Sequence, residues 1–316
     1  MTALRGQLAG YLSLRRGMGH QMSGAEYLLT QFVGYLDGHD AATVTLEHAL
    51  AWVTLPATAS AGYLSQRMSA VRGFATYLHS LSAGHEIPPP GLFPSGGTRR
   101  AVPYLYSSDD LAALMAATAG LRFPLRQATY RTLIALLAVS GLRISEAIRL
   151  DDADVDHAGN LLQVRDSKFG KSRLVPLHPS TAGALAGYQR SRDQRHPAPH
   201  DPALFISPAG TRLRYRNVLD TFTSLVAAAE LPSRPGRCRP RIHDLRHSLA
   251  VTTLLGWHAD GGDVQARLPL LSTFLGHADP ASTYWYLSAS PELMAAAGAR
   301  LDGDGAAVQL DEALGQ

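Results

Sequence analysis

The chain has one cysteine among its 316 residues, Cys238, and this scarcity excludes an internal disulfide. Arg237 and Arg239 flank the thiol and could lower its pKa, but no base stands at motif spacing from it. We therefore predict that Cys238 is inert rather than catalytic.

Lysine is almost as scarce, because only Lys168 and Lys171 stand beside 27 arginines. Both lie in one short segment, DSKFGKSRLVPL. Arginine is effectively always protonated, whereas the lysine ammonium can release its proton. A lysine retained in such a chain suits the role of a proton donor. The alternative is that both lysines are solvated residues of a turn.

Long apolar runs are also missing. No stretch approaches the roughly 18 uninterrupted apolar residues of a membrane span. The N-terminal sequence MTALRGQLAGYLSLRRGMGH carries charged and polar residues where a secretory signal needs a continuous apolar run. We predict a cytoplasmic protein without membrane contact. With 46% hydrophobic residues, the chain is long enough for two domains, each with its own core.

The formal net charge of +3 is too small to indicate nucleic-acid binding by itself, so the distribution of charge matters more. Residues 101–300 hold 22 basic side chains against 17 acids, whereas residues 301–316 hold four acids and no base. The body is basic and the tail is acidic. A run without acids, Arg234, Arg237, Arg239 and Arg241, predicts either a solvated face or contacts to phosphate.

Proline and glycine divide the chain near residue 100. Residues 88–103, PPPGLFPSGGTRRAVP, would interrupt any helix, and we predict a linker there. In residues 1–87, apolar residues recur at three- and four-residue intervals and predict a small helical domain, with helices at 25–38, 46–53 and 61–81. We place Arg67 and Arg72 on the polar side of its last helix.

Residues 104–300 mix helical patterns with short β-rich runs. After an acid-rich turn at 151–160, LLQVRD and RLVPL predict a hairpin with Lys168 and Lys171 at its tip. The remaining predicted elements are a strand at 203–207 and helices at 107–117, 125–139, 215–229, 243–258, 264–276 and 281–300. The fold class is therefore mainly α with a small β-sheet, followed by an acidic tail at 301–316.

Three short motifs hold the candidate site residues. In SGLRISE, Arg143 and Glu146 are three residues apart and can meet on one helical face. In HDLRH, His243 and Arg246 have the same spacing. His247 stands four residues after His243, but a zinc site at this pair is disfavoured, because HDLRH lacks the glutamate of an HExxH helix and no third ligand is close in sequence. In LGHADPASTYWYL, His277 precedes Tyr286 by nine residues.

Together, these side chains and a lysine suit phosphodiester transfer through a covalent intermediate without metal. Two guanidiniums can hold the non-bridging oxygens of a phosphate. A tyrosine hydroxyl, with an ordinary pKa of about 10, becomes a nucleophile when a base and cations assist it. Histidines supply an acid, a base or a hydrogen-bond donor, and lysine can protonate the departing sugar oxygen.

The order and spacing of these motifs resemble those of the tyrosine recombinases, the phage-integrase-type family of DNA strand-exchange enzymes. The resemblance spans residues 104 to about 290. It implies that Arg143 and Arg246 clamp the phosphate and that Glu146 supports the pocket. It also implies that His243 and His277 are the two pocket histidines. Lys168 falls at the position of the proton donor on the β-hairpin, and Tyr286 at that of the nucleophile.

The resemblance further implies a two-domain, C-shaped DNA clamp with a helical core-binding domain at residues 1–87 and a catalytic domain at 104–300. Its partners would be double-stranded DNA recombination sites, bound by a homotetramer on two sites with a dimer on each, with accessory recombinases as further candidates. No metal, nucleotide or other cofactor is expected. The residues that we predict to contact DNA phosphates are Arg67, Arg72, Lys171, Arg237 and Arg239.

Several alternatives remain open at this stage. Tyr284 stands two residues before Tyr286 and offers a second hydroxyl, and the stretch 256–268 is longer than in a compact family member, which we interpret as a loop extension. The function that we favour is integration, excision or transposition of a mobile element. A non-cleaving DNA-binding accessory protein of the same fold and a type IB topoisomerase are the alternatives.

Overall fold

The computed structural model describes residues 3–94, 102–165, 172–234, 238–277, 283–286 and 293–294. The chain divides into two compact units, Met1–Arg100 and Ala101–Gln316. In the segment predicted to be a linker, the described residues 88–94 and 102–103 contain neither helix nor strand. Among the described residues, no helix is long and apolar enough to cross a membrane.

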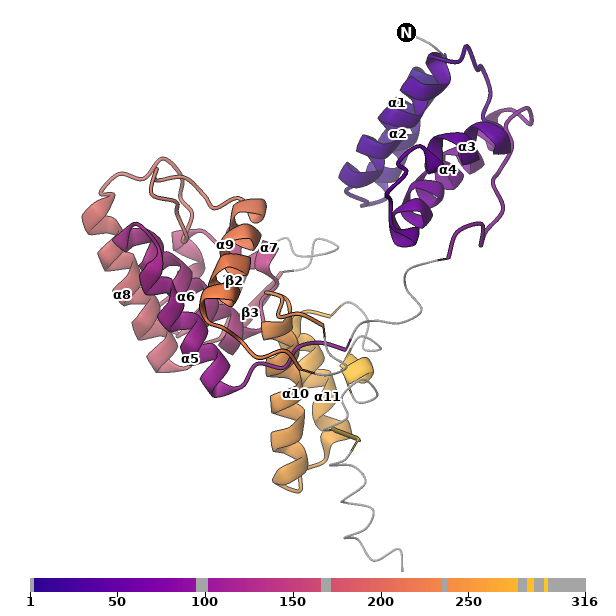
Figure 1. The fold of residues 1–316 in the computed structure, drawn as a ribbon. Coiled ribbons are helices and arrows are strands. Elements are labelled where there is room, and N and C mark those ends of the chain that lie inside the picture. Colours follow the sequence, from indigo (N-terminus) through magenta and orange to yellow (C-terminus); the bar gives the residue numbers. More distant parts are fainter. Residues whose placement is uncertain are drawn as a thin grey trace, which may run out of the picture. The chain divides into compact units, whose positions relative to one another are not determined.

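The N-terminal unit consists of four helices in its described part: α1 (Ala3–Gly17), α2 (Ser23–Asp37), α3 (Leu46–Thr54) and α4 (Ala61–Leu81) (Figure 1). Thr45 and Ser60 cap α3 and α4 by accepting hydrogen bonds from backbone amides. Helix α1 was not among the predicted elements. Its leucines at helical spacing, together with one face of each other helix, bury their side chains in a single core.

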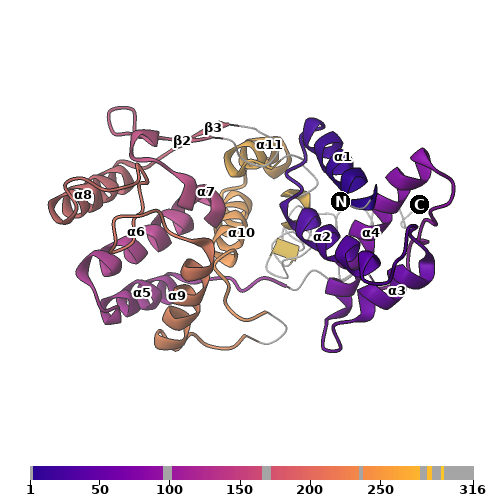
Figure 2. The same ribbon diagram turned by 90° about the horizontal axis from the view of Figure 1, so that it is seen from above.

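The C-terminal unit contains seven α-helices in its described part, and α6 lies among α5, α8 and α10 (Figures 1 and 2). The seven are α5 (Ser108–Ala117), α6 (Pro124–Ser140), α7 (Ile144–Arg149), α8 (Pro179–Arg195), α9 (Tyr215–Ala228), α10 (Asp244–Ala259) and α11 (Val264–Leu275). Ser107 and Asp110 form a capping box at the start of α5. The predicted fold class, mainly helical with a small sheet, is confirmed.

The sheet has three antiparallel strands in the order β1 (Val155–Asp156), β2 (Leu161–Val164), β3 (Arg173–Pro176). In the register of β2 and β3, Leu162 pairs with Val175 and Val164 pairs with Arg173. The strands of the predicted hairpin are therefore confirmed. Its tip, with Lys168 and Lys171, lies outside the described residues.

Two local predictions are wrong. Residues 203–207 form no strand, because Ala203 bridges to Asp151 and Ile206 bridges to Arg212, and these two separate segments form no continuous ladder. The stretch 256–268 is no loop extension, since α10 continues to Ala259 and α11 begins at Val264. Asp263 caps α11 by accepting a hydrogen bond from the amide of Ala266, so only four residues separate the two helices.

A separate apolar cluster holds the end of the described chain against α10 and α11. Leu254 from α10 and Leu271 from α11 pack there with Tyr286 and Leu293. Residues 283–286 and 293–294 are helical, within the stretch predicted as a helix at 281–300. This cluster fixes where the tyrosine segment lies relative to the histidine and arginine of α10.

Candidate active site

Two helix ends bring the predicted arginines together. Gly141 ends α6 and Gly276 ends α11, each in the left-handed conformation at φ +60° and +68°. The Nη1 of Arg246 donates to the carbonyl of Gly141 at 2.6 Å, and the Nη2 of Arg143 donates to the carbonyl of Gly276 at 3.1 Å. Carbonyls at a helix C-terminus lack intrahelical partners and favour cations, so the backbone orients both guanidiniums.

Glu146 lies between two arginines. Its carboxylate is 3% exposed and accepts from the backbone and the Nη1 of Arg143 at 3.0 and 2.8 Å. Arg173 on β3 donates to the same carboxylate from both terminal nitrogens, at 3.2 and 2.9 Å. Burial alone would raise the pKa of Glu146, but the hydrogen bonds from Arg173 and Arg143 lower it to about 2. Glu146 is therefore an anion that orients Arg143.

Sequence analysis missed Arg173 as a site residue. Its Nε also donates to the carbonyl of Phe274 at 3.1 Å, so one side chain ties β3 to α7 and to the last turn of α11. A Cβ at Gly276 would come 2.5 Å from the Nη1 of Arg173, so this residue must remain glycine for Arg173 to keep its place. The available signal was a lone arginine at the start of the β-rich run RLVPL.

Arg246 is 2% exposed, although its side chain is charged. Its Nη2 is buried and has no hydrogen-bond partner among the described residues. Burial and the nearby Arg143 lower the pKa of Arg246 to about 10, which still leaves it protonated at neutral pH. A buried, charged donor without an acceptor is costly, and an anionic oxygen at this point would remove the cost.

The two predicted histidines are neutral in this environment. Burial and the charge of Arg246 lower the pKa of His243, and the same two causes lower the pKa of His277 to about 4. The Nδ1 of His277 lies 2.7 Å from the hydroxyl of Thr283, which fixes its ring. Neutral rings can donate an N–H hydrogen bond to phosphate without carrying charge.

Tyr286 and Tyr284 have opposite environments. Tyr286 is 2% exposed and its ring stacks on that of His277 with centroids 6.2 Å apart, whereas Tyr284 is 47% exposed. The Tyr286 hydroxyl lies 3.0 Å from the Nδ1 of His247, a residue that the sequence analysis considered only as half of a disfavoured zinc pair. The geometry thus favours Tyr286 over Tyr284 as the buried hydroxyl of the site.

The predicted catalytic residues within the described ranges therefore lie together with Glu146, and Lys168 lies outside those ranges. Among the described residues, no group of three or more His, Cys, Asp or Glu side chains could hold a metal ion. The predicted residues supply two oriented cations, two imidazoles and one buried hydroxyl, and Arg173 and His247 add a third cation and a third imidazole. These groups can bind an anionic oxygen and present a nucleophile to it.

The residues predicted to contact DNA phosphates have different environments. Arg67 is 4% exposed, with its guanidinium 3.6 Å from the centre of the Trp52 ring and its Nη2 bonded to the Trp52 carbonyl, so its predicted surface position is wrong. Arg72 donates to the carbonyls of Pro88 and Pro89. Arg239 is exposed, and Lys171 and Arg237 lie outside the described residues.

The rest of the basic run is tied to internal groups. Arg241 pairs with Asp244 at 2.8 Å, and Arg234 pairs with Asp110. The Cys238 thiol donates to Asp244 at 3.4 Å, and burial, reinforced by the carboxylate of Asp244, raises the pKa of the thiol. Its basic neighbours therefore do not activate Cys238, which agrees with an inert thiol.

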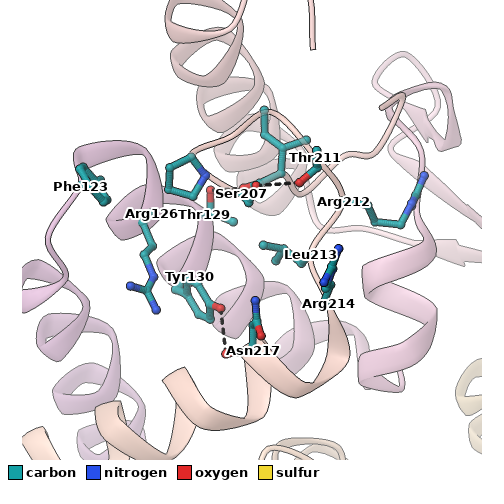
Figure 3. Close-up of a pocket in the computed structure, with 12 residues that line it drawn as sticks. Phe123, Arg126, Thr129, Tyr130, Ser207, Thr211, Arg212, Leu213, Arg214 and Asn217 are labelled. Atoms are coloured by element: carbon teal, nitrogen blue, oxygen red, sulfur yellow. Dashed lines mark hydrogen bonds between the residues drawn. The ribbon is translucent and has the colours of Figure 1, made fainter. Parts of the chain in front are cut away.

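A pocket of about 400 Å³ lies elsewhere in the C-terminal unit, between α6, α9 and the segment 206–214 (Figure 3). The Tyr130 hydroxyl donates to the carbonyl of Asn217 at 3.3 Å on its floor, and Arg126 and Arg214 are among its lining residues. None of the predicted site residues lines this pocket, so it is not part of the site assembled at α7, α10 and α11.

Comparison with known proteins adds a family context to this geometry. Residues 106–292 match the phage integrase family. The protein y4rB of Sinorhizobium fredii, assigned to the integrases and recombinases, is 40% identical over 308 residues, covering 96% of this chain and 98% of y4rB. The tyrosine recombinase XerC of Pseudomonas entomophila is 32% identical over 226 residues, covering 71% and 68%.

Solved structures share the fold. The Tn1549 transposon integrase in complex with transposon right end DNA has a TM-score of 0.61 at 18% identity, covering 96% of this chain and all of that one (100%). The XerH recombinase in a post-cleavage complex with difH substrate has a TM-score of 0.62 at 17% identity, covering 88% and 78%. At these identities the likeness shows the fold, whereas the matched family and the full-length relatives bear on activity.

Proposed function

This chain belongs to the phage integrase family of tyrosine recombinases and is therefore a site-specific DNA strand transferase, and we propose which residues carry out its reaction. Tyr286 is the nucleophile, and Arg143 and Arg246 bind the phosphate to be cut. The observation that carries this assignment is that the buried Nη2 of Arg246, which has no hydrogen-bond partner among the described residues, lies in the same site as the buried Tyr286. A phosphate oxygen would accept a hydrogen bond from the Nη2 of Arg246. The phosphorus of the same phosphate would be the atom that the Tyr286 oxygen attacks.

In the proposed reaction, the Tyr286 oxygen attacks the phosphorus and the bond to the 5′ oxygen breaks. The products are a 3′-phosphotyrosyl bond and a 5′-hydroxyl, and reversal with a second 5′-hydroxyl rejoins strands without ATP. Arg143 and Arg246 hold the charge that grows on the non-bridging oxygens. Burial and the charge of Arg246 lower the pKa values of His243 and His277, which favours neutral rings that donate hydrogen bonds to the same phosphate.

We assign protonation of the departing 5′ oxygen to Lys168, whose position in the resemblance is that of the family's proton donor. Arginine cannot replace it in this role, because arginine does not release its proton at neutral pH. Lys168→Arg should cripple cleavage, and a 5′-bridging phosphorothiolate, whose sulfur leaves without protonation, should restore it. Lys171→Arg is the matched control and should be mild. The reverse pattern would assign the acid to Lys171.

The partners that we propose are double-stranded DNA sites and further copies of this chain. Structures that share the fold include XerH bound to difH substrate and a λ integrase tetramer bound to a Holliday junction. We propose a homotetramer on two DNA sites, with a dimer on each, and a DNA-clamping role for the N-terminal unit. The Tn1549 transposon integrase, which shares the fold, supports our proposal of action on a mobile element, and accessory recombinases are candidate partners.

The decisive test is a covalent adduct on suicide duplex, in which a nick lets the short 5′ product diffuse away. Wild type and Tyr284→Phe should form equal amounts of a protein–DNA adduct that resists denaturant, and Tyr286→Phe should form none. A non-cleaving accessory protein would form no adduct in any variant. Equal adduct from wild type and Tyr286→Phe would exclude Tyr286 and make Tyr284 the next candidate.

A plasmid assay separates recombination from type IB topoisomerase activity. A topoisomerase relaxes supercoiled DNA that carries no recombination site. A site-specific recombinase needs two sites and yields products with exchanged flanking sequence. We expect exchange on plasmids that carry the terminal sequences of its element, and relaxation of site-free plasmids without exchange would refute this assignment.

A further inference from the structure

In the described part of the site, His247 is the imidazole whose ring nitrogen lies within hydrogen-bond distance of the Tyr286 hydroxyl. It lies on the first turn of α10, directly after Arg246, and its Nδ1 is 3.0 Å from the Tyr286 oxygen. Its ring also meets the rings of His243 and Trp285, with centroids 4.7 and 5.7 Å apart. Three aromatic neighbours therefore hold this ring with one nitrogen directed at the proposed nucleophile.

We propose that His247 is a further catalytic residue, the general base that takes the hydroxyl proton of Tyr286 as its oxygen attacks phosphorus; this rests on the proposed role of Tyr286. The O–H bond of Tyr286 breaks, its proton moves to Nδ1 of His247, the oxygen–phosphorus bond forms, and the bond to the 5′ oxygen breaks. On rejoining, the imidazolium returns the proton to the departing Tyr286 oxygen.

One tautomer of His247 gives this hydrogen bond the direction that the step needs. A phenol hydroxyl donates its proton, and a neutral imidazole with its proton on Nε2 accepts at Nδ1. Burial first, and then the positive surroundings, lower the pKa of His247 to about 3, so its ring is neutral at physiological pH. A heavy-atom separation of 3.0 Å is within the reach of direct proton transfer.

Substrate binding would strengthen this base. The groups that lower its pKa are His243, Arg241 and Arg246 at the start of α10, and His277 beyond α11. A phosphodiester bound at the arginines would offset their charge, which raises the basicity of His247 when DNA is present. Without DNA, the tyrosine would keep its proton and stay unreactive toward other electrophiles.

His277 is less suited to the same role. Its ring stacks against that of Tyr286, and its Nδ1 is engaged with the hydroxyl of Thr283 at 2.7 Å. The ring of His277 thus faces the tyrosine ring, whereas His247 directs a nitrogen at the hydroxyl. We assign phosphate binding to His277 and proton removal to His247.

The test is single-turnover cleavage of suicide duplex by full-length protein. Asparagine can accept a hydrogen bond from Tyr286 but cannot take its proton, so His247→Asn should slow cleavage by roughly 10²- to 10⁴-fold. DNA affinity should stay within about twofold, because the ring contacts tyrosine rather than DNA. His258→Asn, at the far end of α10, is the matched control and should cleave at the wild-type rate. The defect should persist on a 5′-bridging phosphorothiolate, since sulfur bypasses the acid and not the base.

Chemical rescue distinguishes a base from a side chain that only holds Tyr286. In His247→Ala, added imidazole should restore cleavage, and 1,2,4-triazole, which has a similar size but is much less basic, should not. Cleavage by His247→Asn within about threefold of wild type, cleavage by His247→Ala faster than wild type, or equal rescue by both azoles would overturn the proposal. Adduct formation by Tyr286→Phe would instead refute the nucleophile assignment, whatever the His247 variants show.

Discussion

Replacement of the buried carboxylate between Arg143 and Arg173 should destabilise the C-terminal unit by a measurable and pH-dependent amount. Folding lowers the pKa of Glu146 from 4.5 to about 2, and each tenfold change in an acid dissociation constant corresponds to about 1.4 kcal/mol, which gives about 3 kcal/mol at neutral pH. Removing one partner of a buried ion pair costs a similar 3–5 kcal/mol or so. Glu146→Gln should therefore lower the free energy of unfolding at pH 7 by about 3 kcal/mol.

The pH dependence follows from the direction in which folding moves this pKa. A carboxyl whose pKa falls on folding contributes its full stability above its ordinary pKa, and the contribution is lost as the pH falls toward the folded pKa. The difference in unfolding free energy between wild type and Glu146→Gln should shrink between pH 4.5 and pH 2, to about 1 kcal/mol near pH 3.

Native-state hydrogen exchange in urea, followed by mass spectrometry of peptides from α7 and β3, measures this difference within one unit of the chain. Asp220→Asn is the matched control, because Asp220 pairs with Arg216 in an exposed ion pair whose loss should cost less than about 0.5 kcal/mol. Equal losses for the two variants, or a difference that grows on acidification, would refute the assignment of Glu146 as a buried anion.

Three further predictions concern the backbone, the clamp and the surface. Gly276→Ala and Gly261→Ala both place a side chain at positive φ, but only the Cβ at residue 276 comes 2.5 Å from a guanidinium nitrogen, that of Arg173. Only Gly276→Ala should therefore lower the cleavage rate, and it should lower the melting temperature more than Gly261→Ala does. Arg246→Lys should slow cleavage by roughly 10²- to 10³-fold while gel-shift affinity changes little, since a shorter cation cannot reach both carbonyl and phosphate. Arg239→Ala should reduce the salt slope of DNA binding by about 0.9, and Arg67→Ala should lower stability and leave that slope unchanged.

The parts of the site that sequence could predict are those fixed by short local spacing. Arg143 and Glu146 share one helical turn, and so do His243 and Arg246, so the fold only had to bring two such turns together. The β2 and β3 strands followed from β-rich runs on both sides of a glycine-containing segment. Phosphodiester transfer through a tyrosine needs arginine, histidine, lysine and tyrosine side chains together, and this requirement limited which residues could form the site.

Residues whose roles depend on distant segments were missed or misplaced. Arg173 meets Glu146 across 27 positions and His247 meets Tyr286 across 39, and no local pattern predicts such contacts. Arg67 follows the helical pattern of an exposed residue, yet it is buried over Trp52, because a guanidinium can stack on an indole and satisfy one donor with a carbonyl. Burial of a charged side chain depends on partners that sequence does not show.

The glycine carbonyls that orient Arg143 and Arg246 have a further consequence for charge matching. A carbonyl fixes a guanidinium without cancelling its charge, and in the described part of the site the only carboxylate paired with any of the three arginines is Glu146, which binds Arg143 and Arg173. Three cations and one anion leave two positive charges. A phosphodiester brings one negative charge, and attack by Tyr286 adds a second to the phosphoryl oxygens while the tyrosine proton stays in the pocket on His247. Negative charge therefore grows beside Arg143 and Arg246 without a change in the net charge of the pocket. The arginines bind the pentacoordinate stage more strongly than the substrate, which is the order of complementarity that accelerates a reaction.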